Sequence, residues 1–202
     1  MARPQFLHPF HHTLSGPCDV YVDPSYTGTG IVFHHLETDC IDLFLLSAEK
    51  TKRTLDRFYS SAAVIRDQFS TLLGSALHDG LVPTVYMEQP FPNGQSSAGL
   101  FGLQFLLLDV LRSCSVQTYG FTASMVARGI KRVFAPVKDG STARKEIVSS
   151  LLQSHPVVYS REKLSWAGAD IQTAYLFMHF IKRCPEVKVS LVDYGFSGGR
   201  KP

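Results

Sequence analysis

The apolar residues in the first quarter of the chain fall in short runs that turn-forming residues separate. The runs occupy 19–22, 31–33 and 41–46, and the first ends at Asp23-Pro24, shortly before Gly-Thr-Gly at 28–30. Short runs of β-branched and aromatic residues bounded by Gly, Pro and Asp are typical of strands. The pattern therefore predicts three consecutive strands joined by brief links, as in an antiparallel meander.

The hydrophobic period then changes. Between 55 and 77 the apolar residues recur at steps of three and four, which predicts an amphipathic helix, and Gly80 follows it. The later predicted elements are strands at 82–87 and 116–119 and helices at 97–113, 142–153 and 166–183. A strand reached through a crossover helix joins its sheet in parallel. The order β-β-β-α-β-α-β-α-α thus predicts an α/β fold, with a mixed five-stranded sheet flanked by helices.

Length and composition limit the number and the kind of domains. The chain has 202 residues, of which 45% are hydrophobic and 18% charged, and these values fit one globular domain. We expect a flexible arm at 1–16, a domain at 17–196 and a flexible tail at 197–202. A net charge of +3 permits nucleic-acid binding without indicating it. Because no apolar run reaches the ~20 residues of a membrane span and no secretion signal is evident, we expect a soluble, intracellular protein.

The cysteines and histidines give no metal-binding pattern. Cys18, Cys40, Cys114 and Cys184 show no C-x-x-C spacing, which argues against a zinc site and against a disulfide framework. Histidines are concentrated in the first 35 residues, and we expect them to be surface or arm residues rather than metal ligands; they are His8, His11, His12, His34 and His35.

Three carboxylates stand where an α/β sheet collects its ligands. Asp23 ends the first predicted strand, Glu88 ends the fourth, and Asp170 lies in the first turns of the last helix. Ligands of such sheets bind at the carboxyl ends of strands, so the three acids could converge on one edge. Mg²⁺ and Mn²⁺ prefer oxygen ligands, and two such ions together can hydrolyse a phosphodiester. Each acid also has an ordinary explanation, as a turn former, a surface acid or a charge near a helix N-terminus.

The order of these acids and their neighbours resembles a known family. The sequence Tyr-Val-Asp-Pro-Ser-Tyr-Thr-Gly-Thr-Gly at 21–30 is similar to the opening motif of the RuvC-type Holliday-junction resolvases. Glu-Gln-Pro-Phe at 88–91 resembles their second motif, and Gly-Ala-Asp at 168–170, followed by Ala174, resembles their final acidic helix. The similarity covers roughly 20–182 with the motifs in order.

This resemblance implies a ribonuclease-H-like fold and a specific activity. The chain would be a Mg²⁺-dependent endonuclease that nicks branched DNA, the four-way junction above all. Two Mg²⁺ or Mn²⁺ ions would be held by Asp23, Glu88 and Asp170. The sequence departs from the family at Ala167, where resolvases usually have a second acid or a histidine. That departure puts a fourth ligand in doubt.

The resemblance also assigns residues that would meet DNA. Phe91 stands where the family has an aromatic residue that stacks at the junction. Either Arg144 or Lys145 occupies the place of a lysine near the scissile phosphate, and Lys145 is our candidate for the catalytic role. The densest basic region would bind phosphates; it consists of Arg128, Lys131, Arg132, Lys138, Arg144 and Lys145.

The predicted helix around 98–111 is apolar on nearly every face. One face is expected to lie against the core, and apolar residues on the opposite face indicate a partner. In resolvases the corresponding helix helps to form a two-fold dimer, so the resemblance implies a homodimer.

Three other functions compete with the resolvase. A terminase-like or general nuclease of the same fold would cut linear DNA, and a catalytically inactive module would only bind branched DNA, as Ala167 could suggest. An actin- or sugar-kinase-like ATPase is disfavoured, because the chain is too short for two lobes.

Overall fold

Among the residues that the structure describes, seven strands form one sheet, and the helices α1, α2 and α6 lie against it. The computed structural model describes residues 5–6, 15–48, 55–89, 98–122, 125, 147–148, 151, 169–184 and 192–195. The strands are β1 (Gln5–Phe6), β2 (Gly16–Asp23), β3 (Thr29–His35), β4 (Ile41–Leu46), β5 (Leu81–Glu88), β6 (Gln117–Phe121) and β7 (Val192–Asp193). The helices are α1 (Leu55–His78), α2 (Ala98–Ser113) and α6 (Ala169–Arg183).

The sheet is mixed, in the order β1-β4-β3-β2-β5-β6-β7. Short links join β2, β3 and β4, and these strands pair antiparallel. The helices α1 and α2 lead into β5 and β6, so β2, β5 and β6 run parallel. These pairings confirm the predicted mixed sheet and its five strands. The hydrophobic pattern did not reveal the two-residue strands β1 and β7, and β1 lies within the segment predicted to be an arm.

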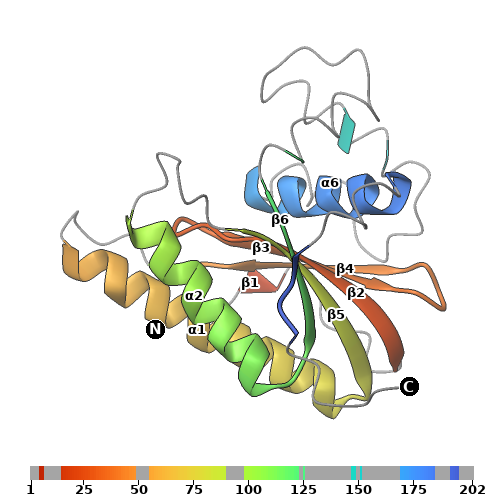
Figure 1. Ribbon diagram of the computed structural model, residues 1–202, viewed down its shortest axis with the longest axis horizontal. Helices are drawn as coiled ribbons and strands as arrows, with labels where there is room; N and C mark the ends of the chain where they lie inside the picture. Colours follow the sequence, from red (N-terminus) through yellow and green to blue (C-terminus); the bar gives the residue numbers. More distant parts are fainter. Residues whose placement is uncertain are drawn as a thin grey trace.

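Helices lie on both faces of the sheet. Figure 1 shows α1 and α2 on one face and α6 on the other. Side chains alternate between the faces along a strand, and β2 contributes buried side chains to both faces. Val20 and Val22 lie in the core beneath α1 and α2, whereas Tyr21 lies in the core beneath α6. A strand covered on both sides reads as a continuous apolar run, which is why the sequence pattern identified it.

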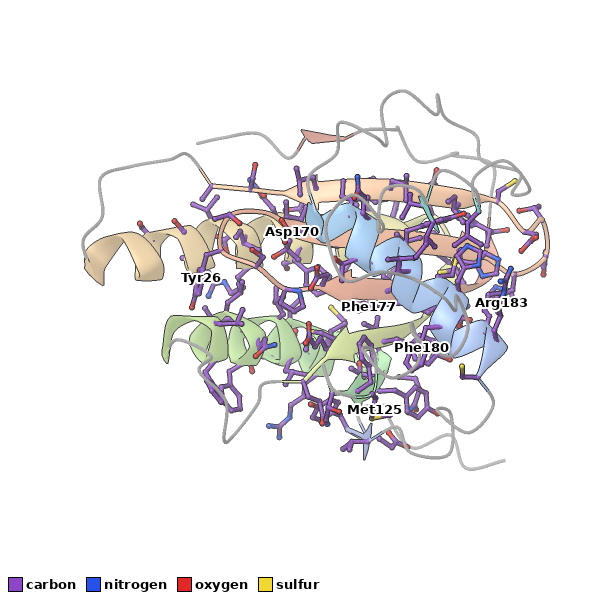
Figure 2. The ribbon with its side chains drawn as sticks, turned by 90° about the horizontal axis from the view of Figure 1, so that it is seen from above. Tyr26, Met125, Asp170, Phe177, Phe180 and Arg183 are labelled. Carbon is purple, nitrogen blue, oxygen red and sulfur yellow. The ribbon has the colours of Figure 1, made fainter. Side chains whose placement is uncertain are left out.

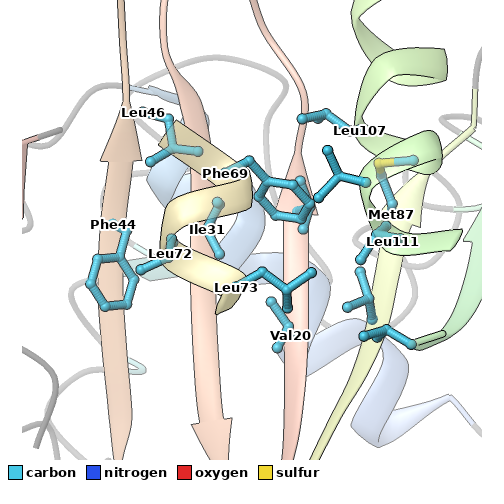
Figure 3. Packing of buried hydrophobic residues seen from close by; sticks show 14 of the residues in the cluster. Val20, Ile31, Phe44, Leu46, Phe69, Leu72, Leu73, Met87, Leu107 and Leu111 are labelled. Atoms are coloured by element: carbon cyan, nitrogen blue, oxygen red, sulfur yellow. The ribbon is translucent and has the colours of Figure 1, made fainter. Parts of the chain in front are cut away.

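The core beneath α1 and α2 is mainly aliphatic. Phe69, Leu72 and Leu73 of α1 pack against the strands together with Leu107 and Leu111 of α2 (Figure 3). The α1 positions follow the three- and four-residue spacing that predicted this helix, and α1 buries the face that the spacing indicated. The helix predicted at 97–113 from its apolar character is present as α2.

The helix α6 is buried along most of its length. Its core contributions are Ile171, Ala174, Tyr175, Leu176, Phe177, Met178, Phe180 and Ile181. The sequence predicted this helix to begin at 166, and the described helix begins at Ala169. Of the predicted helix at 142–153, only 147–148 and 151 are described, and all three residues are helical.

Two further expectations can be compared with the described residues. All four cysteines are free thiols. The sequence spacing argued against a disulfide framework. Within the described part of the chain, no helix combines the length and apolar character needed to cross a bilayer. The division into arm, domain and tail stays a prediction.

Candidate active site

Asp23 and Glu88 end two neighbouring parallel strands. In the register between β2 and β5, Val22 is the partner of Met87. Asp23 and Glu88 are the next residues of these strands and the last of each. The two acids therefore lie side by side at the carboxyl edge of the sheet, where the sequence placed them.

Both carboxylates belong to the α6 face. Tyr21 and Tyr86, two positions earlier in the same strands, lie in the core beneath α6 with their rings stacked 5.2 Å apart. Side chains two residues apart in a strand point to the same face. Asp23 and Glu88 consequently point to the face that α6 covers, and each is only half-buried.

The third acid reaches the same edge through a close contact between backbones. Gly30 of β3 is the partner of Asp23 in the sheet. A Cβ atom added to Gly30 would lie 2.3 Å from both the carbonyl carbon and the carbonyl oxygen of Asp170. A Cβ on Gly28 would lie 3.6 Å from Asp170 Oδ2. The first turn of α6 thus sits directly on Gly30, with the Asp170 carboxylate in ordinary contact distance of Gly28. This places Asp170 next to the end of β2.

Figure 2 shows the sheet from above, with α6 running across it. Asp170 lies at one end of α6 and Arg183 at the other, with Phe177 and Phe180 between them over the sheet. The helix therefore brings one end to the carboxyl edge of β2 and β5.

Polar residues of the opening motif hold the turn between β2 and β3. Thr29 Oγ1 accepts a hydrogen bond from Ser25 N at 3.3 Å and donates one to Ser25 O at 3.1 Å. Ser25 Oγ and Thr27 Oγ1 are 2.9 Å apart. Tyr26 extends from the turn toward α2, where its hydroxyl would lie 2.7 Å from a Cβ on Gly99. The small and hydroxyl residues of the motif thus shape the loop that follows Asp23.

Partial burial changes the acidity of Glu88. Loss of solvent raises the pKa of its carboxyl group above the ordinary value. The main chain around it is firmly held, because Gln89 N donates to Phe121 O at 2.7 Å and Gln104 Nε2 donates to Glu88 O at 3.1 Å. A partly buried carboxylate is a group whose charge a bound cation would stabilise.

The far end of α6 is attached to the turn between β3 and β4. Lys182 Nζ lies 3.2 Å from Asp39 Oδ1 and 3.2 Å from His34 Nε2. His34 is buried, as is its neighbour His35, whose Nε2 lies 2.8 Å from Asp42 Oδ2. The expectation that these two histidines are surface residues is wrong, because β3 is covered on both faces and each histidine has an acidic partner.

The three carboxylates are of the chemical type that a hard divalent cation prefers. All three acids offer carboxylate oxygens near one edge of the sheet, and Gly30 lets the backbone of Asp170 approach the end of β2 closely. Among the described residues, no three His, Cys, Asp or Glu side chains form a group that could hold a metal ion. The three carboxylates share an edge, but they do not surround a common point.

Comparison with known proteins agrees with the geometry at the level of fold. A scan of protein-family models gives no match, and a search of curated proteins gives none either. Among solved structures, Thermus thermophilus RuvC matches over 87% of this chain and 99% of that chain, with a TM-score of 0.50 and 17% identity. The chain has the RuvC fold. RuvC from the same organism in complex with a Holliday junction substrate matches 82% of this chain and 94% of its own, with a TM-score of 0.45 and 17% identity.

Several residues predicted to act at the site lie outside the described part of the chain. These are Phe91, Arg128, Lys131, Arg132, Lys138, Arg144, Lys145 and Ala167. The described part adds residues that the sequence reading missed. Gly30 belongs to the opening motif, which gives no sign of its contact with α6, and Gln104 is a lone polar residue in the apolar helix.

Replacing Gly30 with alanine should loosen α6. The added methyl group would occupy the place of the Asp170 backbone, so the helix must move, and we expect the free energy of unfolding to fall by ~1–3 kcal/mol. Gly74→Ala in α1 is the matched control, because nothing lies within 4 Å of a Cβ there. That substitution should stabilise the protein by ~0.5–1 kcal/mol. Chemical denaturation measures both, and an undiminished stability of Gly30→Ala would contradict the seating of α6 on β3.

Replacing Glu88 with glutamine should stabilise the protein at neutral pH. A raised pKa means that ionisation of Glu88 is harder in the folded state, so stability falls as the pH rises from the ordinary glutamate pKa through the raised value. Glu88→Gln removes this loss. The variant should be more stable than the wild type at pH 7, and the difference should vanish below about pH 4. Denaturation across this pH range, with Glu37→Gln as the control for loss of one exposed carboxylate, measures the effect; a lower stability of Glu88→Gln at pH 7 would contradict it.

Proposed function

We propose that this chain is a divalent-metal-dependent endonuclease that nicks branched DNA, with the Holliday junction as its substrate. The proposal is supported by the position of Asp23 and Glu88 at the ends of neighbouring parallel strands, with the start of α6 at Asp170 packed on Gly30 beside Asp23, in a sheet with the RuvC fold. Acids from three distant parts of a chain reach one edge only if the fold brings them there. The preference for a junction rests on the resemblance of the sequence motifs.

Asp23, Glu88 and Asp170 would hold two Mg²⁺ or Mn²⁺ ions. Bound ions of this kind activate water and stabilise the leaving oxygen of a phosphodiester. The protein would contribute the oxygen ligands and their orientation. Gly30 sets the position of Asp170, and the hydrogen-bonded turn after Asp23 sets the start of the loop.

The contacts with DNA are assigned from the resemblance to the resolvases and from the charge of the basic residues. Lys145 would lie near the scissile phosphate, and Phe91 would stack on a base exposed at the branch point. The basic residues Arg128, Lys131, Arg132, Lys138 and Arg144 would neutralise further phosphates, which predicts affinity that falls as salt rises. The enzyme would act inside the cell, where branched DNA arises.

A homodimer through α2 would place two active sites on the two strands of a symmetric junction. Support comes from Phe105, which is 61% exposed although α2 buries Leu103, Leu107 and Leu108. Phe101 and Leu106 are half-buried beside it. These three apolar residues would form the centre of the dimer contact, and sedimentation equilibrium measures the assembly directly.

The three acids should be required for cutting and dispensable for folding. Asp23→Asn, Glu88→Gln and Asp170→Asn should each lower Mg²⁺-dependent nicking of a labelled four-way junction by more than the ~10–100-fold typical of residues that only support a metal ligand. Binding of the junction should persist, because removal of negative charge near phosphates favours association. Asp19→Asn, in the same strand four residues before Asp23, is the matched control and should cut normally.

The substrates distinguish the competing functions. Wild-type protein is incubated with junction, replication fork, linear duplex and single strand, with and without Mg²⁺. Paired symmetric nicks in the junction alone support the resolvase, and cleavage of every substrate would favour a terminase-like or general nuclease. Retention of the junction without cleavage would favour an inactive binding module, and normal cutting by Asp170→Asn would remove Asp170 from the site.

A further inference from the structure

Gln104 is a buried polar residue on the apolar side of α2. Only 2% of its surface is exposed, and Leu103 and Leu107 beside it belong to the core. Its Nε2 donates a hydrogen bond to the main-chain oxygen of Glu88 at 3.1 Å, and its Oε1 has no hydrogen-bond partner among the described residues. Burial of an amide is unfavourable unless its hydrogen bonds are made. A leucine would suit the packing here, so the glutamine calls for a specific reason.

The backbone hydrogen-bonding groups of β5 point alternately toward its two neighbouring strands, β2 and β6. The carbonyl oxygen of Gly80, just before β5, accepts a hydrogen bond from Gly16 N on the β2 side at 3.0 Å. At the other end of β5, Gln89 N donates to Phe121 O on the β6 side at 2.7 Å. Successive residues of a strand direct their N–H and C=O groups to opposite sides. Even-numbered residues of β5 therefore face β2, and the carbonyl group of Glu88 is among them.

The partner strand has no donor at that point. In a parallel ladder, a carbonyl oxygen accepts from the residue that follows its partner. The register gives Asp23 as the position opposite Glu88, and the residue after Asp23 is Pro24. Proline has no N–H group. The ladder between β2 and β5 therefore cannot continue beyond this position, and the Glu88 carbonyl group needs a donor from elsewhere.

We propose that Gln104 is a positioning residue for Glu88, because it supplies the hydrogen bond that Pro24 cannot give. The amide of Gln104 reaches the strand end from α2 and fixes the main chain of Glu88. The chain before Glu88 is held by the ladder, and Gln89 after it is held by β6. Gln104 thus completes the support of the residue that carries the carboxylate. The inference rests on the proposed role of Glu88 as a metal ligand.

A double-substitution cycle tests the inference. Gln104→Leu keeps the bulk and removes the donor, and Pro24→Ala restores a backbone N–H. In the wild-type background, Gln104→Leu should lower the rate of Mg²⁺-dependent junction cleavage about tenfold and raise the Mg²⁺ concentration for half-maximal rate, as loss of a residue supporting a metal ligand does. In the Pro24→Ala background, the same substitution should change both quantities less than about twofold.

A second buried glutamine provides the matched control. Gln68 in α1 also donates through Nε2 to a main-chain oxygen, that of Ser47, at 3.1 Å. Gln68→Leu should lower the melting temperature as Gln104→Leu does, and it should leave the Mg²⁺ dependence unchanged. An equal effect of both glutamine substitutions on Mg²⁺ dependence would overturn the positioning role. So would an equal loss from Gln104→Leu in the two backgrounds at position 24.

The same cycle is also measured as free energy of unfolding, which needs no activity. Gln104→Leu should be less destabilising with Pro24→Ala than without it, and additive effects would overturn the replacement of one donor by the other. If the wild type cuts no DNA, the proposed function fails, and the unfolding cycle still decides whether Gln104 takes the place of the missing backbone donor.

Discussion

The contact between Gly30 and the backbone of Asp170 determines how the rest of the site is arranged. A helix can approach a strand this closely only where the strand has no side chain, and here a Cβ atom would lie 2.3 Å from the Asp170 carbonyl group. Because Gly30 is the sheet partner of Asp23, the same contact places two of the three acids together. The attachment of Lys182 to Asp39 at the other end of α6 holds the helix along the sheet.

The carboxyl edge of the sheet is less favourable for stability than the rest of the sheet. Burial raises the pKa of Glu88, and its strand ends beside a proline that cannot extend the ladder. A ladder closed by a backbone donor and an apolar residue in place of Glu88 would give a more stable protein. The loss of stability is confined to the ends of these two strands, since the rest of β2 and β5 is paired in the ladder and contributes side chains to both cores.

Much of the fold followed from periodicity, and part of the site followed from strand ends. The run at 19–22 and the helical spacing at 55–77 depend on local sequence, and the structure has β2 and α1 there. Asp23 and Glu88 could be placed at one edge because they follow strands. The sequence could not show that β3 is buried on both faces, so His34 and His35 were assigned to the surface. Nor could it show Gln104 beneath Glu88, because that contact joins residues 16 positions apart through tertiary packing.

The convergence of Asp23, Glu88 and Asp170 is tested most directly by locating bound Mn²⁺. Crystals soaked in Mn²⁺ would give an anomalous difference map that requires no assumption about substrate. The account predicts peaks within ligand distance of all three carboxylates, at about 2.0–2.2 Å from oxygen, and their loss in Asp170→Asn. Peaks confined to other positions, such as the His34 and Asp39 pair, would contradict it, as would Mn²⁺ bound by Asp23 and Glu88 equally well without Asp170.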